Sequence, residues 1–324
     1  MAEDVIETII KCFASSILLI DIFGIFGNIN LIVVTLAFKQ IRTSKCSLLI
    51  GLIAALDLVC TGFGIQAFVY DMTHKHDLLL YRNECFAKIW PFVFIACLET
   101  VYMLLLAIDR FVAVAKPVLY KQINSIMYFA IATAPGALFG TVIVVLGFAI
   151  DENDNLIQFC LPTTSLNLDA QWIYTLGITV INCCTVVVYV TVGFFIWSKS
   201  KSSGSSDLLF KQQIKITKTI AFIVFFFVLT WVAGHLISFV ANVIFHGNMR
   251  RCLYHLLSML PTHLNYAMNF YIYFWRNTTY RHLFKHQIRC AVSTIFCGRC
   301  CRPTTIAVLE ATSTRVQRLS NSQK

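Results

Sequence analysis

The chain contains seven long stretches in which apolar residues dominate and charged residues are rare. A helix that crosses a membrane needs about 20 mostly apolar residues in a row. The stretches lack the alternation of a barrel strand, and a helix satisfies its own backbone hydrogen bonds in lipid. The pattern therefore predicts an all-α fold, a seven-transmembrane helix bundle, with spans at about Phe13–Phe38, Ser47–Tyr70, Phe86–Ile108, Met127–Ile150, Trp172–Trp197, Ile216–Phe245 and Cys252–Trp275.

Composition agrees with a membrane protein. Of the 324 residues, 58% are hydrophobic and only 13% are charged, more apolar material than a soluble protein of this size requires. The 13 cysteines are scattered along the chain and do not have the spacing of a zinc finger. The first apolar stretch lacks a small-residue cleavage site, so we interpret it as a retained anchor. No motif for an organic cofactor is present, and none is expected.

The charged residues predict how the chain is oriented in the membrane. Most of the 26 Lys and Arg residues follow the first, third and fifth apolar stretches or lie after the seventh, whereas Glu3, Asp4 and Glu7 open the chain. The positive-inside rule then predicts an extracellular N-terminus (residues 1–12), a membrane domain (13–275) and a basic, disordered cytoplasmic tail (276–324). The net charge of +10 lines a membrane face, so no nucleic-acid partner is needed to explain it.

The third apolar stretch ends in Asp109-Arg110-Phe111. An arginine at this point can reach water at the membrane boundary with its long side chain. Asp109 can hold the guanidinium in a charge-assisted hydrogen bond. The alternative is a simple positive stop after a transmembrane helix, which would need no aspartate.

Other spans carry further short motifs. They are Gly27-Asn28, Leu52-Ile-Ala-Ala-Leu-Asp57, Phe227-Val-Leu-Thr-Trp231, Asn265-Tyr-Ala-Met-Asn269-Phe-Tyr-Ile-Tyr273, and Phe274-Trp275-Arg276-Asn277 at the start of a short amphipathic eighth helix. With these motifs the chain resembles a rhodopsin-like (class A) G-protein-coupled receptor from roughly Gly24 to Phe284. It departs from that pattern where prolines are usual, with Ala233 and Phe270 in their places. These departures are similar to those of nematode serpentine chemosensory receptors of the Srsx type.

The resemblance implies a chemosensory receptor and no enzyme activity. It implies that an extracellular small molecule or peptide binds in the bundle, that a heterotrimeric G protein is activated, and that the protein lies in the plasma membrane, including that of sensory neuron cilia. The polar tail suits a receptor kinase and an arrestin as further partners. Two alternatives are a ligand-gated ion channel or transporter-like protein, for which only Asp21, Asp57 and Glu99 are acidic within the spans, and a membrane scaffold without a ligand.

The resemblance also implies the site residues. A disulfide would join Cys85 to Cys160, the alternative being two free thiols. Phe92 stands where amine receptors carry Asp, and His263 where opsins carry Lys, so neither a biogenic amine nor retinal is expected. The coupling and switch residues would be Asp109, Arg110, Trp231, Asn269 and Tyr273. The ligand-binding residues would be Phe92, Val93, Ala96, His235, Phe239, Met259, Thr262 and His263, although a single histidine in such a position is more often an ordinary buried one.

The third span carries an acidic residue, Glu99, in addition to Asp57 of the second span. Glu99 lies 11 residues before Arg110, about three helical turns, and so faces the bundle on the same stripe. The resemblance places Asp57, Asn265 and Asn269 opposite, where related receptors bind Na⁺. Two carboxylates in a low-dielectric bundle cannot both stay charged without a cation. We expect a proton shared at rest, with Na⁺ at Asp57 as the alternative; a third possibility is that Glu99 turns toward the lipid headgroups.

Overall fold

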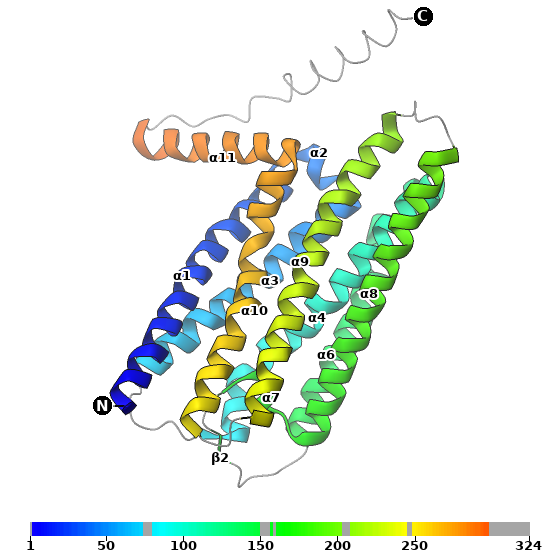
Figure 1. Cartoon of the computed structure of the whole chain (residues 1–324). Helices are drawn as coiled ribbons and strands as arrows, with labels where there is room; N and C mark the ends of the chain where they lie inside the picture. The colour runs from blue at the N-terminus through cyan, green and yellow to red at the C-terminus, as the bar shows by residue number, and fades with distance from the viewer. Residues whose placement is uncertain are drawn as a thin grey trace, which may run out of the picture. The chain divides into compact units, whose positions relative to one another are not determined.

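The computed structural model describes residues 2–73, 80–149, 156–157, 160–202, 208–244 and 248–297. Two units, Met1–Thr278 and Thr279–Lys324, are described separately. In the first unit the described residues form seven long helices, which run side by side (Figure 1) and confirm the all-α prediction. They are α1 (Ala2–Ala37), α3 (Lys45–Thr73), α4 (Arg82–Ala115), α6 (Ser125–Ala149), α8 (Leu168–Ser202), α9 (Leu208–Ile244) and α10 (Asn248–Arg276).

Short elements connect the long helices. They are α2 (Lys39–Arg42), α5 (Pro117–Gln122), α7 (Pro162–Ser165) and the two-residue strands β1 (Leu80–Tyr81) and β2 (Leu156–Ile157), which pair in antiparallel fashion. Leu80 lies opposite Ile157 and Tyr81 opposite Leu156. Beside this pairing, a disulfide joins Cys85 in the first turn of α4 to Cys160 just before α7, as the resemblance implied.

Helix α4 is the centre of the bundle. It packs against α3, α6, α8 and α9, while α1 packs against α3 and α10, and α10 against α9. Buried side chains therefore occur along most of its length, from Cys85 to Val114. A helix of 34 residues with partners on several sides can hold groups at both ends and in the middle in fixed register.

Six of the long helices in the described part of the chain are long and apolar enough to cross a membrane, namely α1, α3, α4, α6, α8 and α9. Large apolar side chains such as Phe23, Val187 and Phe194 are exposed on these helices, as expected for surfaces that face lipid. Helix α10 is more polar and buries His263, Asn265 and Asn269. Polar side chains in a spanning helix face the bundle interior, which is where these three lie.

Glycines allow neighbouring helices of the bundle to approach one another closely. A Cβ atom at Gly140 or Gly147 of α6 would lie 2.7 Å from Phe94 or 2.2 Å from Phe86 of α4. A Cβ at Gly27 of α1 would lie 2.8 Å from Phe270 of α10. Aromatic side chains of one helix thus fill the space left by glycines of the next, which gives close packing without the usual prolines.

The described residues are helical near both ends of the chain. Helix α1 begins at Ala2, so the segment before the first span is helical rather than irregular. In the second unit, α11 (Thr278–Cys297) places Tyr280, Leu283 and Phe284 at the spacing of one helical face, which agrees with an amphipathic eighth helix. The tail from residue 298, with its predicted kinase and arrestin contacts, lies outside the described residues.

Candidate functional site

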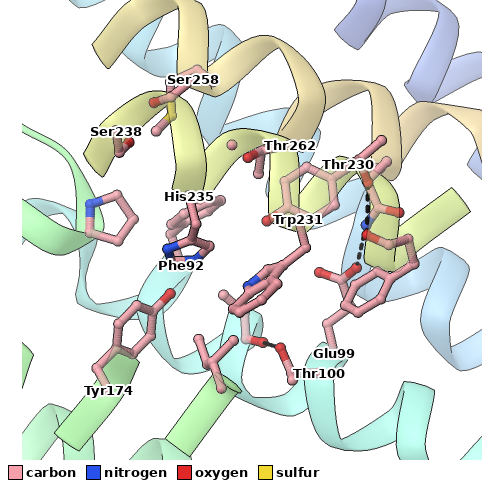
Figure 2. A pocket seen from close by; sticks show the side chains of 18 residues that line it. Phe92, Glu99, Thr100, Tyr174, Thr230, Trp231, His235, Ser238, Ser258 and Thr262 are labelled. Carbon is pink, nitrogen blue, oxygen red and sulfur yellow. Dashed lines mark hydrogen bonds between the residues drawn. The ribbon is translucent and has the colours of Figure 1, made fainter. Parts of the chain in front are cut away.

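A cavity of about 140 Å³ lies among α4, α8, α9 and α10 (Figure 2). Its wall combines aromatic rings with hydroxyl groups and one carboxyl group. A concave, mostly apolar space with a few convergent polar groups is the usual form of a small-molecule site. Five of the eight predicted ligand-binding residues line it: Phe92, Ala96, His235, Met259 and Thr262.

The other three predicted ligand-binding residues are not among the lining residues. Val93 has no exposed surface and belongs to a core cluster with Phe86 and Ile143. Neighbouring residues on a helix point about 100° apart, so Val93 faces α6 when Phe92 faces the cavity. His263 turns toward α1 for the same reason, and the side chain of Phe239 lies outside the part of the chain that the structure describes.

His263 forms a buried contact that the sequence did not predict. Its Nδ1 lies 2.7 Å from Oδ1 of Asp21, whose side chain is fully buried in α1. Gly64 of α3 makes room for this contact, because a Cβ there would lie 2.3 Å from Oδ2 of Asp21. The partners are 242 residues apart, and no spacing or motif in the sequence links them.

Glu99 and Asp57 meet in the middle of the bundle. The amide of Asn269 donates to Oδ2 of Asp57 at 2.6 Å, and that of Asn265 donates to Oε1 of Glu99 at 3.1 Å. Asp57 and Glu99 are 0% and 3% exposed, so Glu99 does not reach the lipid headgroups. The two carboxyl groups interact electrostatically with each other, and Oδ1 of Asp57 has no hydrogen-bond partner within the described residues.

Glu99 is also part of the cavity wall, together with Asn265. On α9 the ring of Trp231 lies in the same wall, with its centroid 4.4 Å from that of His235. Trp231 also packs against the core cluster of α4, α6 and α8. Glu99 of the acid pair and the predicted switch tryptophan therefore both contact the space in which a ligand would lie.

The opposite end of α4 carries the predicted ion pair. Nε of Arg110 donates to Oδ2 of Asp109 at 2.9 Å, a second guanidinium nitrogen contacts the same oxygen, and both side chains are almost fully buried. The hydroxyls of Tyr120 (α5) and Tyr128 (α6) donate to Oδ1 of Asp109, each at 2.8 Å. A simple positive stop would not require this arrangement, in which α5 and α6 each contribute a hydrogen-bond donor to Asp109.

Tyr120 ties α5 to two neighbours. Its backbone oxygen accepts from Nζ of Lys45 at 2.6 Å, and the same ammonium lies 4.8 Å from the centre of the Tyr120 ring. Burial and the nearby Asp109 carboxylate raise the pKa of the Tyr120 hydroxyl. The hydroxyl therefore stays protonated and acts as a donor. The roles of Tyr120 and Tyr128 were not apparent from the sequence, because neither lies in a recognised motif.

A seven-helix bundle with a disulfide at one end of its third long helix, a cavity below it and a buried Asp-Arg pair at the other end defines the rhodopsin-like class of G-protein-coupled receptors. Comparison with known families narrows this class. Residues 21–288 match the family described as Serpentine type 7TM GPCR chemoreceptor Srsx, and the chain belongs to this family of chemosensory receptors.

Curated relatives are similar at low identity. Olfactory receptor 4F6 of Homo sapiens is 24% identical over 239 residues, which cover 67% of this chain and 75% of the relative. Olfactory receptor 5H19 of Mus musculus is 25% identical over 202 residues, 57% of this chain and 65% of the relative. These matches favour a chemosensory receptor over the channel or transporter alternative.

Proposed function

We propose that the receptor binds a small extracellular molecule in the cavity and transmits binding to a heterotrimeric G protein at the Arg110 end of the bundle. The cavity among α4, α8, α9 and α10 supports this proposal most directly, because it places five expected ligand residues around one space. The disulfide end would face outside, and the Asp109–Arg110 end would face the cytoplasm.

Buried polar contacts extend from the cavity toward the Arg110 end. Glu99 and Asn265 line the cavity, and one layer further along Asn269 donates to Asp57. Tyr273 follows Asn269 by one helical turn and is 3% exposed. A ligand that binds more tightly to a second arrangement of these contacts shifts the receptor population toward that arrangement. The shift cannot exceed the difference between the ligand's affinities for the two arrangements.

The resting state is held at Arg110. The guanidinium is paired with Asp109, which also accepts from two tyrosines, so three helices contribute to the closed arrangement. Release of Arg110 would expose a cation to the G protein, with Tyr273 and Asn269 moving on α10. This role for the five predicted coupling and switch residues is a proposal that the buried ion pair supports.

The acid pair would hold either a proton or a sodium ion. Oxygen ligands suit a hard cation, and the unpartnered Oδ1 of Asp57 next to Glu99 fits such an ion. A proton shared by the carboxyl groups serves the same need without a cation, since a protonated acid can donate to its neighbour. We favour the shared proton, because each carboxyl group already has an amide donor to its other oxygen.

Nucleotide exchange on purified heterotrimeric G proteins tests the proposal. The receptor in lipid nanodiscs should accelerate exchange when pools of small molecules are added. Arg110→Leu should abolish exchange while the ligand still raises the melting temperature of the variant. Lys116→Gln, an exposed basic residue near the same helix end, is the matched control and should retain most of the exchange activity.

Two results would contradict the proposal. One is a ligand-evoked membrane current that persists when all G proteins are blocked, which would indicate a channel. The other is undiminished exchange in Arg110→Leu, since the variant lacks the cation that the proposal places at the G-protein interface.

A further inference from the structure

We infer that the cavity selects small cationic nitrogen compounds, such as short alkylamines, whose ammonium group is neutralised by the carboxyl group of Glu99. This inference names the ligand class of the proposed receptor function and rests on that function. Glu99 lies two helical turns further along α4 than Phe92. Phe92 is the position from which the resemblance argued against a biogenic amine, because amine receptors carry Asp there.

The charges around the cavity are unbalanced. Two other buried acids are each beside a basic group, Asp109 with Arg110 and Asp21 with His263. Glu99 instead faces Asp57 and an asparagine amide, and among the described lining residues there is neither Lys nor Arg. Two acids in a low-dielectric bundle need one positive charge between them, and a ligand ammonium in the cavity would supply it.

Two hydroxyl groups near Glu99 already donate to backbone oxygens. The Thr100 hydroxyl donates to the backbone oxygen of Ala96 at 2.9 Å, and the Thr230 hydroxyl is within 2.9 Å of the oxygens of Phe226 and Phe227. Both hydroxyls can offer only lone pairs to a ligand. Figure 2 shows Thr100, Thr230 and Glu99 around the same part of the cavity as Trp231. The two hydroxyls and a Glu99 carboxylate accept hydrogen bonds, which suits a ligand that donates them.

Aromatic rings in the cavity wall also favour a cationic ligand. Phe92, Trp231 and Tyr266 line the cavity, and the rings of Phe92 and Tyr266 meet edge to face with centroids 6.3 Å apart. Aromatic faces attract an ammonium group electrostatically, and more strongly where water is excluded. The same rings provide apolar contact for the carbon skeleton of the ligand.

The volume limits the size of the ligand. A cavity of about 140 Å³ is close to the roughly 150 Å³ cavity that admits benzene in an engineered protein. Compounds of about five to seven non-hydrogen atoms therefore fit without rearrangement. The inferred class is a short or cyclic alkylamine rather than a peptide or a catecholamine-sized molecule.

Proton exchange accompanies binding in this arrangement. A proton shared by Glu99 and Asp57 would leave when the ammonium arrives, so the net charge of the site is preserved. Other titratable groups near Glu99 are Cys60 (α3), Tyr174 (α8), His235 (α9) and Tyr266 (α10), with the Asp21–His263 pair one turn away. Because several groups could contribute to a pH effect, the test relies on ligand charge rather than on pH.

The test measures ligand binding by thermal stabilisation of the purified receptor, independently of any G protein. The probes are n-butylamine, isoamylamine and cyclohexylamine, each compared with the alcohol of the same carbon skeleton. We expect the amines to raise the melting temperature at concentrations at which the alcohols do not. Glu99→Gln keeps size and hydrogen bonding but removes the charge, and should weaken amine binding roughly 10-fold or more.

Asp21→Asn is the matched control, because it removes a buried carboxyl group that does not line the cavity. It should keep the preference for amines. If Glu99→Gln does not fold, Glu99→Asp, with a shorter reach, should retain the amine preference at reduced affinity. Equal stabilisation by amines and alcohols, no stabilisation by either, or an unchanged amine preference in a folded Glu99→Gln would overturn the inference. Amine binding without nucleotide exchange would instead contradict the proposed coupling function and leave the ligand class supported.

Discussion

At the scale of single residues, the buried ion pair of Asp109 and Arg110 is supported by side chains from other helices. Asp109 and Arg110 are adjacent in sequence, yet the lone pairs of Asp109 are divided between Arg110 and two tyrosines from other helices. Hydrogen bonds to a charged group typically contribute about 1.5–3 kcal/mol. The tyrosines therefore have a large share in holding the arrangement that we assign to the resting state.

We expect Tyr120→Phe and Tyr128→Phe to raise signalling in the absence of ligand. Each change removes one donor to Asp109 and shifts the balance of states by roughly tenfold, since about 1.4 kcal/mol corresponds to that factor. The double variant should exceed both single ones. Basal nucleotide exchange per receptor molecule measures the effect. Tyr102→Phe, which loses only a hydrogen bond to Thr133, is the control, and equal basal rates in all variants would reject this role.

The acid pair leads to a second prediction at this scale. In the ligand-free receptor, raising the pH should remove the shared proton, leave two carboxylates side by side and lower the melting temperature. Sodium should change it little compared with choline at equal ionic strength. Glu99→Ser should lose this pH dependence and become stabilised by sodium, because Asp57 alone can then bind the ion. A parent receptor that is strongly stabilised by sodium and indifferent to pH would disprove the shared proton.

At the scale of elements, glycines decide how closely the helices approach. Gly62 and Gly64 lie two residues apart on α3, but only Gly64 faces the Asp21–His263 contact. A Cβ atom at Gly64 would lie 2.3 Å from Asp21 and 2.5 Å from His263, whereas a Cβ at Gly62 meets nothing within 4 Å. The same helix therefore offers a glycine that is packed against side chains and an open one, two residues apart.

We predict that Gly64→Ala lowers the melting temperature of the purified receptor by several degrees. Overpacking at such a site costs about 1–3 kcal/mol, because the helices or the His263 ring must shift. Gly62→Ala should be neutral or stabilising, since alanine is the better helix former. Equal melting temperatures for the two variants would show that α1, α3 and α10 can separate at little cost.

At the scale of the whole molecule, α4 organises the receptor. Cys85, Glu99 and Arg110 lie along one helix, so the disulfide, the cavity wall and the ion pair keep fixed distances along its axis. A helix rises about 1.5 Å per residue, so Cys85 and Arg110 lie roughly 38 Å apart along the axis of α4. This distance is enough to span the hydrocarbon core of a membrane. The opening of the Arg110 end thus depends on how the other helices move against α4.

Topology gives a prediction for the whole chain. An epitope tag before Met1 should be accessible to antibody on intact cells, and a tag after Lys324 only after permeabilisation. The sequon Asn277-Thr-Thr279 would lie in the cytoplasm and should carry no glycan. Gel mobility before and after glycosidase treatment, with Asn277→Gln for comparison, checks this point. A glycan on Asn277 would reverse the proposed orientation.

The sequence by itself determined the seven helices, the position of Arg110 at a helix end, and the placing of Glu99 toward the bundle. These follow from periodicity, because lipid forces apolar runs into helices and the helical repeat then fixes which residues share a face. The disulfide between Cys85 and Cys160 and the family were accessible through motifs that occur in the right order.

Only the tertiary structure decided which side chains meet across helices. Val93 and His263 leave the cavity because a rotation of about 100° per residue separates them from the lining positions Phe92 and Thr262. The Asp21–His263 contact and the tyrosines on Asp109 join residues whose separation in sequence carries no signal. Their positions depend on how the helices rotate and approach one another, which is set by packing at glycines and aromatic rings rather than by any local pattern.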